Sequence, residues 1–299
     1  MPSMIQIGTD GKYEGVVDGV VVIRSKNEGR VRYVLKSQYR QAKPEMNLVR
    51  QQEQLIQMPK SEFPINERFA FLEHFVRMVA RRKSNSLVIT GPGGLGKTHT
   101  VVETLKACGK VEDTIGSEDG DYLMVKGFST AKALFRTLWE NNSKLIIYDD
   151  CDAVLTDPVA VNILKGALDS SDKRVISWNA EFRDTEEMPN RFEFTGRVIF
   201  ISNRSMDRIP QALISRSMRV SLDMTTDEKV ERLEAIIHND NFMPHLERSV
   251  KQDAMDFIKS IASKCTDLNI RTAQQLAQLR DDTEDMALFC RTAAYMCLS

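Results

Sequence analysis

A glycine-rich loop that ends in a lysine and a threonine is the stretch of this sequence best suited to chemistry. It spans residues 91–98, GPGGLGKT, directly after the β-prone residues 86–90. We expect all four glycines to take positive φ and to let the backbone approach the phosphate oxygens closely, so that consecutive N–H groups point toward an anion. Lys97 would reach the β and γ phosphates of a nucleotide, and the Thr98 hydroxyl would ligate Mg²⁺. The residues expected around the phosphates are Gly91, Pro92, Gly93, Gly94, Leu95, Gly96, Lys97, Thr98 and His99.

Two adjacent carboxylates follow a second apolar run further along the chain. Residues 145–148, LIIY, lead into Asp149 and Asp150. Mg²⁺-dependent phosphoryl chemistry uses such a pair, because one carboxylate can hold the metal while the second orients or deprotonates the attacking water. We therefore expect Asp149 at the metal and Asp150 at the water.

Two further polar positions follow a third apolar run. Asn203 comes directly after residues 197–202 and could donate a hydrogen bond to the attacking water or to the γ-phosphate. Arg216 follows a short helix expected at 209–215. Two interpretations of Arg216 stay open, namely an ordinary salt bridge at a helix end and a role in catalysis.

The elements that position these residues alternate between strand and helix. Strands are expected at 86–90, 122–126, 144–148 and 197–202, and a further strand at 219–222 closes the series. This alternation predicts parallel βαβ units, whose ligands bind at the carboxyl ends of the strands. The predicted fold is α/β, a P-loop three-layer αβα sandwich with a mainly parallel sheet.

From Thr225 onward the pattern is helical only. Thr225 and Glu228 have capping-box spacing, and apolar residues recur at helical intervals to the end of the sequence. This predicts a C-terminal all-helical domain. We expect an N-terminal β-hairpin and linker region at 1–61, a nucleotide-binding α/β domain at 62–223 and the helical domain at 224–299.

The N-terminal region contains a predicted β-hairpin over residues 17–36 and a basic segment. Residues 24–43 carry seven lysines and arginines against one glutamate, with two tyrosines among them. Basic residues interleaved with aromatic ones are typical of nucleic-acid contact. The alternative is that these charges only keep exposed strands soluble and unpaired.

Composition restricts the class of protein. The net charge of −1, with 42% hydrophobic and 28% charged residues, is typical of a globular protein and gives no global affinity for nucleic acid. The five cysteines lack paired C-x-x-C spacing, which argues against a disulfide framework or a structural zinc site and favours a reducing compartment. Without a leader pattern or a run of about 18 apolar residues, we expect a cytoplasmic protein with no membrane contact.

The order of parts from residue 62 onward resembles the AAA+ family of P-loop ATPases. The loop at 91–98 matches the family's Walker A motif, and residues 145–150 match its Walker B motif. One departure is Asp150, because the family usually has glutamate there.

Three single residues extend the resemblance. Asn203 lies where the family has its sensor 1 polar residue. The run ALISRS, which contains Arg216, resembles the serine-arginine finger of clamp-loader-like members. Arg271, in the run NIRT, resembles the sensor 2 arginine of the lid.

The resemblance implies that ATP and Mg²⁺ bind between the α/β domain and the lid. It also implies that Arg216 acts on ATP held by a neighbouring subunit, in a ring or helical homo-oligomer built from head-to-tail contacts. An arginine acting in trans is worth about 10³ to 10⁵ in rate in related P-loop enzymes, so hydrolysis would depend on assembly.

The leading hypothesis is a Mg²⁺-dependent ATPase that remodels DNA or a protein–DNA complex in replication or recombination, with DNA and a protein partner as ligands. The alternative is a nucleotide-switched loader or scaffold with slow hydrolysis, which the shorter side chain of Asp150 favours. A small-molecule P-loop kinase is disfavoured, because it leaves Asn203, Arg216, Arg271 and the lid without a role.

Overall fold

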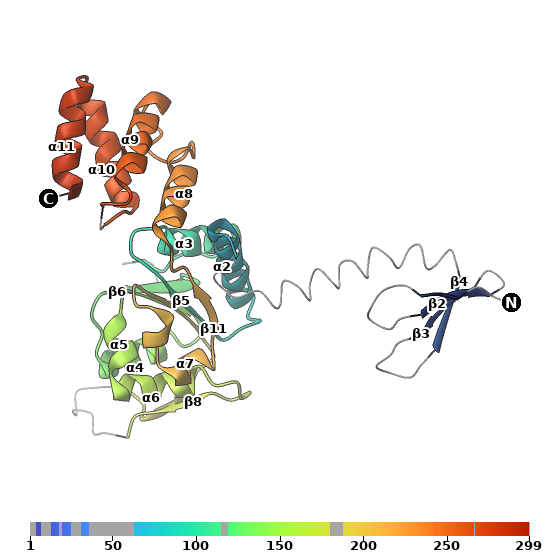
Figure 1. The fold of residues 1–299 in the computed structure, drawn as a ribbon. Helices are drawn as coiled ribbons and strands as arrows, with labels where there is room; N and C mark the ends of the chain where they lie inside the picture. The colour runs from blue at the N-terminus through green and yellow to red at the C-terminus, as the bar shows by residue number, and fades with distance from the viewer. Residues whose placement is uncertain are drawn as a thin grey trace. The chain divides into compact units, whose positions relative to one another are not determined.

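The structure is a computed structural model (Figure 1). It describes residues 63–114, 119–179, 188–265 and 267–298 with their side chains, and the backbone of four strands between residues 4 and 35. The chain divides into two compact units, Met1–Phe63 and Pro64–Ser299.

The first unit contains a four-stranded antiparallel sheet. Its strands, in spatial order, are β1 (Met4–Gln6), β2 (Tyr13–Val17), β3 (Val20–Arg24) and β4 (Val31–Leu35). The pairing of β3 with β4 confirms the predicted hairpin, whereas β1 and β2 were not predicted. The side chains of the basic segment at 24–43 lie outside the described residues.

The second unit is built on a five-stranded parallel sheet in the order β11-β5-β10-β7-β6. The strands are β5 (Ser86–Thr90), β6 (Tyr122–Lys126), β7 (Leu145–Asp149), β10 (Arg197–Ser202) and β11 (Met218–Ser221). Ser202 pairs with Thr90 and Ile201 with Asp149, so the carboxyl ends of the three central strands are level. The polar residues that follow these strands therefore meet at one edge.

Helices cover both faces of this sheet. They are α2 (Ile65–Ala80), α3 (Lys97–Ala107), α4 (Ala131–Glu140), α5 (Asp152–Thr156), α6 (Pro158–Ala167), the 3₁₀ turn η2 (Met206–Arg208) and α7 (Gln211–Ile214). Alternate side chains of β5 separate two hydrophobic cores, because Leu87 and Ile89 pack with α2 and α3 while Val88 packs with α4 to α7. The helix after β5 and the helix after β10 thus lie on opposite faces, which opens a ligand crevice between these neighbouring strands.

A short antiparallel pair lies apart from the main sheet. It consists of β8 (Val175–Ser177) and β9 (Arg191–Glu193), and β8 contacts α6. The apolar run at 175–178 therefore does not add a strand to the parallel sheet.

The C-terminal helices are α8 (Thr226–Ile237), α9 (Arg248–Ile261), α10 (Ile270–Asp282) and α11 (Met286–Leu298). The predicted capping box of Thr225 and Glu228 is present at the start of α8. These helices enclose a core of their own, which includes Leu233, Ile258 and Phe289. The chain is thus an α/β protein with a parallel sheet and a C-terminal group of helices. Over the residues that the structure describes, no helix has both the length and the apolarity needed to cross a bilayer.

Candidate functional site

The glycine-rich loop connects β5 to α3 and takes its shape from left-handed backbone positions. Gly96, the N-cap residue of α3, has φ +95°. Gly91 has φ +136°, and a Cβ there would lie 2.8 Å from the backbone of Leu222. The expectation of positive φ is wrong for Gly93, whose φ is not in that range; a Cβ at Gly93 would instead lie 3.4 Å from the Asn203 amide oxygen. Glycine at that position allows a close approach between the loop and Asn203.

Lys97 is the charged residue of the loop, and it is buried, with 5% of the residue exposed. Its Nζ donates to the carbonyl oxygens of Gly91 and Pro92, both at 2.7 Å, and to Oδ1 of Asn203 at 2.8 Å. Burial lowers the pKa of Lys97, although the nearby carboxylates of Asp150 and Asp149 oppose this shift. The three acceptors hold the ammonium group at the mouth of the loop.

Thr98 and Asp149 form a second direct contact between the loop and the sheet. The Thr98 hydroxyl donates to Oδ1 of Asp149 at 3.0 Å, with Oδ2 at 3.2 Å. Asp149 is buried as the last residue of β7. Burial raises its pKa and the adjacent Asp150 adds to this effect, while the Thr98 hydrogen bond lowers it. A hydroxyl and a carboxylate are oxygen ligands of the kind that Mg²⁺ takes, and the charge of a cation would reverse the effect of burial on Asp149.

Asp150 is exposed and has the left-handed backbone conformation, with φ +56°. Its N–H donates to the carbonyl oxygen of Ile201 at 3.0 Å, which continues the ladder between β7 and β10. Few residues other than glycine take positive φ, and aspartate is among those that do so most often. The conformation turns the chain away from the sheet directly after Asp149.

A cavity of about 380 Å³ lies at this edge of the sheet. The predicted site residues that line it are Gly93, Gly94, Gly96, Lys97, Thr98, His99, Asp149, Asp150, Asn203 and Arg271. Ile270 and Arg271 belong to α10, so the C-terminal helices form one wall. The N–H of Ile270 also donates to the carbonyl oxygen of Gly94 at 2.7 Å. The loop is therefore in direct contact with the helical part of the chain.

Three predicted cradle residues do not line this cavity. Gly91 and Pro92 contribute the carbonyl oxygens that hold Lys97. The Leu95 side chain is 1% exposed and belongs to the hydrophobic core of the C-terminal helices. Leu95 therefore anchors the loop to those helices.

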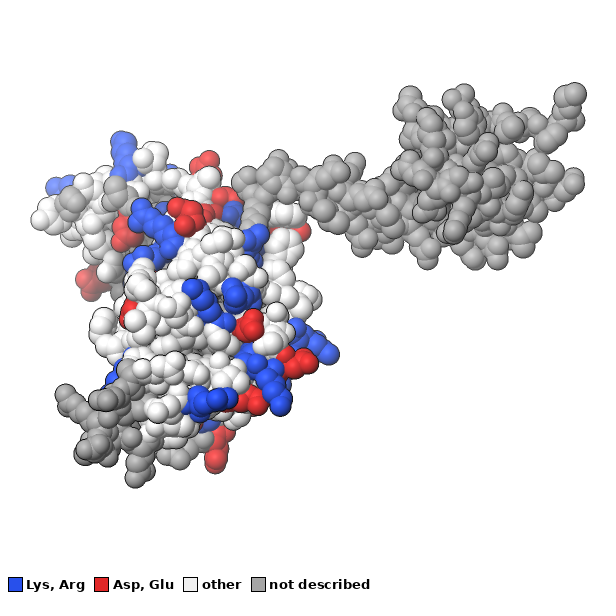
Figure 2. Space-filling model, turned by 90° about the horizontal axis from the view of Figure 1, so that it is seen from below, with Lys and Arg blue, Asp and Glu red and all other residues white. Residues whose placement is uncertain are grey.

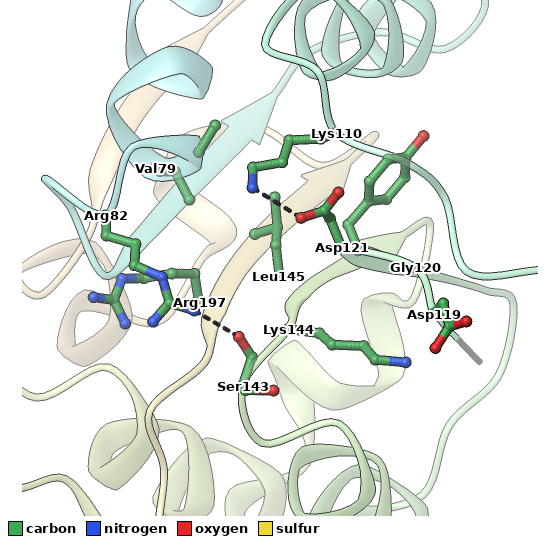
Figure 3. Close-up of a pocket in the computed structure, with 12 residues that line it drawn as sticks. Val79, Arg82, Lys110, Asp119, Gly120, Asp121, Ser143, Lys144, Leu145 and Arg197 are labelled. Atoms are coloured by element: carbon green, nitrogen blue, oxygen red, sulfur yellow. Dashed lines mark hydrogen bonds and ion pairs between the residues drawn. The ribbon is translucent and has the colours of Figure 1, made fainter.

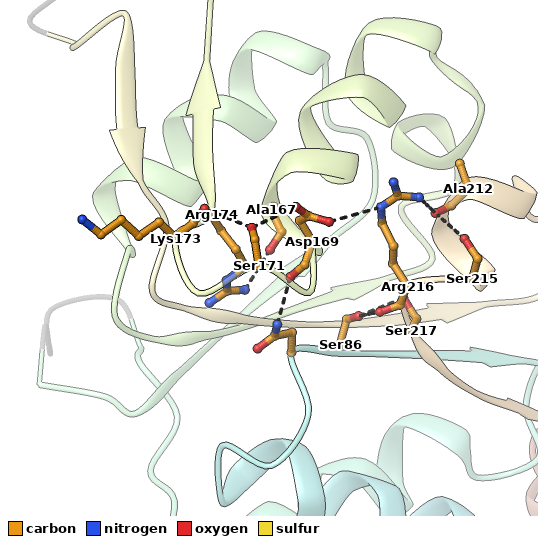
Figure 4. Close-up of polar contacts among 11 residues, drawn as sticks. Ser86, Ala167, Asp169, Ser171, Lys173, Arg174, Ala212, Ser215, Arg216 and Ser217 are labelled. Atoms are coloured by element: carbon orange, nitrogen blue, oxygen red, sulfur yellow. Dashed lines mark hydrogen bonds and ion pairs between the residues drawn. The ribbon is translucent and has the colours of Figure 1, made fainter.

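Arg216 lies outside the cavity, at the amino end of β11 (Figure 4). Its carbonyl oxygen accepts a hydrogen bond from Ser86, the first residue of β5, at 3.2 Å. Its guanidinium group donates to the carbonyl oxygen of Ala212 at 3.0 Å and lies 3.9 Å from a carboxylate oxygen of Asp169. The structure thus separates Arg216 from Lys97 by the length of the sheet.

Two polar residues that line the cavity, Lys126 and Gln274, were not predicted. Lys126 ends β6 and is paired in register with Asp149. Gln274 lies one turn after Arg271 on α10, so both side chains share a helix face. The sequence offers only a weak indication that Lys126 lines the cavity, namely a basic residue at the end of a strand. No local sequence feature indicates that Gln274 does so.

A hydrogen-bonded group behind Asn203 was also missed. Asp152 accepts from the Ser202 hydroxyl at 2.6 Å and from Nε of Arg204 at 3.1 Å. These bonds tie the start of α5 to both residues that flank Asn203, and so restrict its position.

The parallel sheet and the helices on both of its faces place this chain in the α/β structural class, with a cavity beside the glycine-rich loop at the carboxyl edge of the sheet. No model of a known protein family matches the chain. The chain is 32% identical over 231 residues to the "Uncharacterized 36.7 kDa protein in nrdC-mobD intergenic region" of Enterobacteria phage T4, an alignment that covers 71% of this chain and 69% of the T4 protein. The chain belongs to the same family as this T4 protein.

Proposed function

We propose that this protein is an AAA+ P-loop ATPase that binds ATP and Mg²⁺, hydrolyses ATP and uses the energy to remodel DNA or a protein–DNA complex. The observation that carries the proposal is a pair of contacts in one cavity. Lys97 and Thr98, at the end of the glycine loop, each touch a polar residue at the carboxyl end of another strand. Lys97 contacts Asn203, after β10, at 2.8 Å, and Thr98 contacts Asp149, the last residue of β7, at 3.0 Å.

These contacts support a division of roles among the residues. The loop N–H groups and the N-terminus of α3 favour phosphate oxygens, because the positive end of the helix dipole and unpaired N–H groups both point there. Lys97 would exchange its carbonyl acceptors for phosphate oxygens. Thr98 and Asp149 would hold Mg²⁺, which neutralises phosphate charge during transfer.

Asp150 and Asn203 would act on the attacking water, Asp150 as the base and Asn203 as a hydrogen-bond donor. Asn203 fits this role because its Oδ1 accepts from Lys97, which leaves its amide nitrogen to donate. Arg271 would reach the phosphates from the helical lid, since it lines the same cavity.

Arg216 would complete the site of a neighbouring subunit in a ring or helical homo-oligomer. Its place at the amino edge of the sheet supports this assignment, because Arg216 does not line the cavity of its own chain. An intracellular, cytoplasmic location is part of the same proposal.

A second candidate function is a nucleotide-switched loader or scaffold with slow hydrolysis. The exposure and left-handed backbone of Asp150 favour it. Its side chain is one methylene shorter than the glutamate usual in AAA+ proteins, which reduces its reach toward water.

Steady-state ATP hydrolysis separates the candidates when it is measured over a range of protein concentrations, with and without single- and double-stranded DNA. A remodelling ATPase gives turnover per subunit that rises with protein concentration and with DNA. Slow turnover that DNA leaves unchanged, together with tight ATP binding, rejects the remodelling function in favour of the switch. Absence of ATP binding rejects both.

A further inference from the structure

A second cavity, of about 310 Å³, lies at the opposite edge of the sheet (Figure 3). Its lining includes the first residues of β6, β7 and β10, which are Tyr122, Leu145 and Arg197. The intervening strand β7 has 5 residues and spans about 16 Å, so this cavity is distinct from the one beside the glycine loop.

Four basic side chains line this cavity, and two of them have carboxylate partners. Nζ of Lys110 lies 2.8 Å from a carboxylate oxygen of Asp121, and Lys144 forms an ion pair with Asp113. The other two, Arg82 and Arg197, form no ion pair within the part of the chain that the structure describes. Arg82 donates to the carbonyl oxygen of Ser143 at 2.9 Å. The lining also includes the carboxylates of Asp119 and Asp121, so four basic side chains face two acidic ones and the cavity has an excess of positive charge.

The guanidinium groups of Arg82 and Arg197 overlap in the view of Figure 3, and the charge of Arg82 acts on that of Arg197. Nη1 of Arg197 donates to the carbonyl oxygens of Thr195 and Gly196, while its Nε is buried without a hydrogen-bond partner in the described structure. Burial lowers the pKa of Arg197, and the charge of Arg82 lowers it further. Burial also lowers the pKa of the adjacent Arg174, to about 10, with Arg197 and Arg82 contributing. Like charges held this close destabilise one another unless an anion lies between them.

Arg82 takes a backbone conformation that favours glycine. It has φ +59° and lies two residues after the end of α2. Its N–H donates to the carbonyl oxygen of Val79 and that of Lys83 donates to Met78, which is the Schellman pattern in which the left-handed residue is usually glycine. The left-handed backbone disfavours arginine at this position, whereas its charge complements the carboxyl end of α2.

We propose that this cavity binds a small phosphate-bearing anion, with Arg82 and Arg197 as its guanidinium donors. The planar fork of arginine matches the oxygens of a phosphate, and charge-assisted hydrogen bonds of this kind are the strong ones. The cavity volume is at the lower end for ligand sites, which suits a small anion. Figure 2 shows basic and acidic side chains interspersed over the described part of the face in view, without the broad basic groove that follows a nucleic-acid backbone.

Calorimetric titration of the full chain with inorganic pyrophosphate tests this proposal. The Lys97→Ala variant serves as the background, because it weakens anion binding at the glycine loop and leaves the second cavity intact. In this background we expect one pyrophosphate per chain. The added changes Arg82→Gly and Arg197→Gln should each weaken binding by about tenfold or more.

Arg82→Gly also separates a binding role from a structural one. Glycine suits the left-handed position, so the thermal midpoint of the ligand-free protein should stay equal or rise while pyrophosphate binding is lost. Lys83→Gln is the matched control, since it removes one positive charge from the same turn outside the cavity lining. It should leave pyrophosphate binding unchanged.

Three results would overturn the proposal. The first is no pyrophosphate binding in the Lys97→Ala background, and the second is binding that Arg82→Gly and Arg197→Gln leave unchanged. The third is binding of a short single-stranded oligonucleotide through Arg82 and Arg197 by a protein that does not bind pyrophosphate. That result would identify this edge of the sheet as a nucleic-acid contact. Because the titration measures neither ATP binding nor hydrolysis, its outcome is independent of the proposed ATPase activity.

Discussion

The two edges of the parallel sheet are both proposed to bind anions, but with different groups. At the carboxyl edge the proposed donors are backbone N–H groups of the glycine loop and α3, with one buried lysine, Lys97, held by three acceptors. At the amino edge the proposed donors are side chains, chiefly Arg82 and Arg197, in a cavity whose lining has four basic residues and two acidic ones.

Strand direction explains the difference. Helices that follow parallel strands begin at the carboxyl edge, where their unpaired N–H groups gather, and end at the amino edge, where carbonyl groups gather. Arg82, after α2, and Lys110, after α3, are therefore favoured by the helix ends as well as by any ligand. A basic residue at the amino edge is consequently weaker support for a binding site than a polar residue at the carboxyl edge.

The largest expected effect is on the rate of ATP hydrolysis and concerns both edges of the sheet. Arg216 lies at the amino edge of its own chain but is proposed to act at the carboxyl-edge cavity of a neighbouring subunit. Arg216→Ala should lower kcat for ATP by about 10³-fold or more while ATP affinity stays unchanged, since an arginine acting in trans stabilises only the transition state. Mixing this variant with Lys97→Ala should restore part of the activity, because some interfaces then combine an intact arginine with an intact lysine. Arg219→Ala, on the exposed side of β11, is the control. Full activity in Arg216→Ala would contradict the shared site.

Leu95→Ala tests whether the loop is anchored by a side chain that takes no part in binding phosphate. Leu95 is 1% exposed within the core of the C-terminal helices, so its truncation should lower the free energy of unfolding by about 2–5 kcal/mol. Urea denaturation measures this change. Leu288→Ala, at a position that is 43% exposed on α11, should stay within about 0.5 kcal/mol of the unmodified protein. An unchanged stability with loss of ATP binding would place Leu95 in the nucleotide site instead.

Lys97→Ala should weaken ATP binding by about 10- to 150-fold, the equivalent of about 1.5–3 kcal/mol for hydrogen bonds from a charged donor. Titration with ATP in the presence of Mg²⁺ measures it, after circular dichroism has established that the variant is folded. Lys106→Ala is the matched control on α3, since Lys106 is exposed and paired with Glu103. Equal affinities for the two variants would show that the carboxyl edge does not bind the phosphates.

Asp150→Glu should have the smallest effect, a several-fold rise in kcat with KM unchanged, because the longer carboxylate reaches further toward the attacking water. The left-handed backbone at this position should lower the thermal midpoint slightly, since glutamate tolerates it less well than aspartate. Asp149→Glu on the neighbouring residue should instead lower kcat, as Asp149 is buried against Thr98. A fall in kcat for Asp150→Glu would argue that Asp150 already has the reach it needs.

The structure agreed best with the sequence-based predictions where the position of a residue follows from the residues next to it in the chain. Each polar residue placed at the carboxyl edge follows an apolar strand directly, so the strand positions it. The helical C-terminal part was predictable for the same reason, because apolar periodicity and the Thr225 capping box are local features. Gly93 shows the limit of this reasoning. The motif indicates glycine at this position, but only the structure shows that the close approach to Asn203, rather than a positive φ, requires a small residue there.

The sequence alone determined that a glycine-rich loop follows one strand and that carboxylates and an asparagine lie at the ends of two others. Only the tertiary structure decided which further groups join them: Lys126 and Gln274 at the cavity, Leu95 in the helical core and Arg197 beside Arg82. These contacts join segments far apart in the chain. They depend on strand order and helix packing, which many residues set together, and no short run of sequence specifies them.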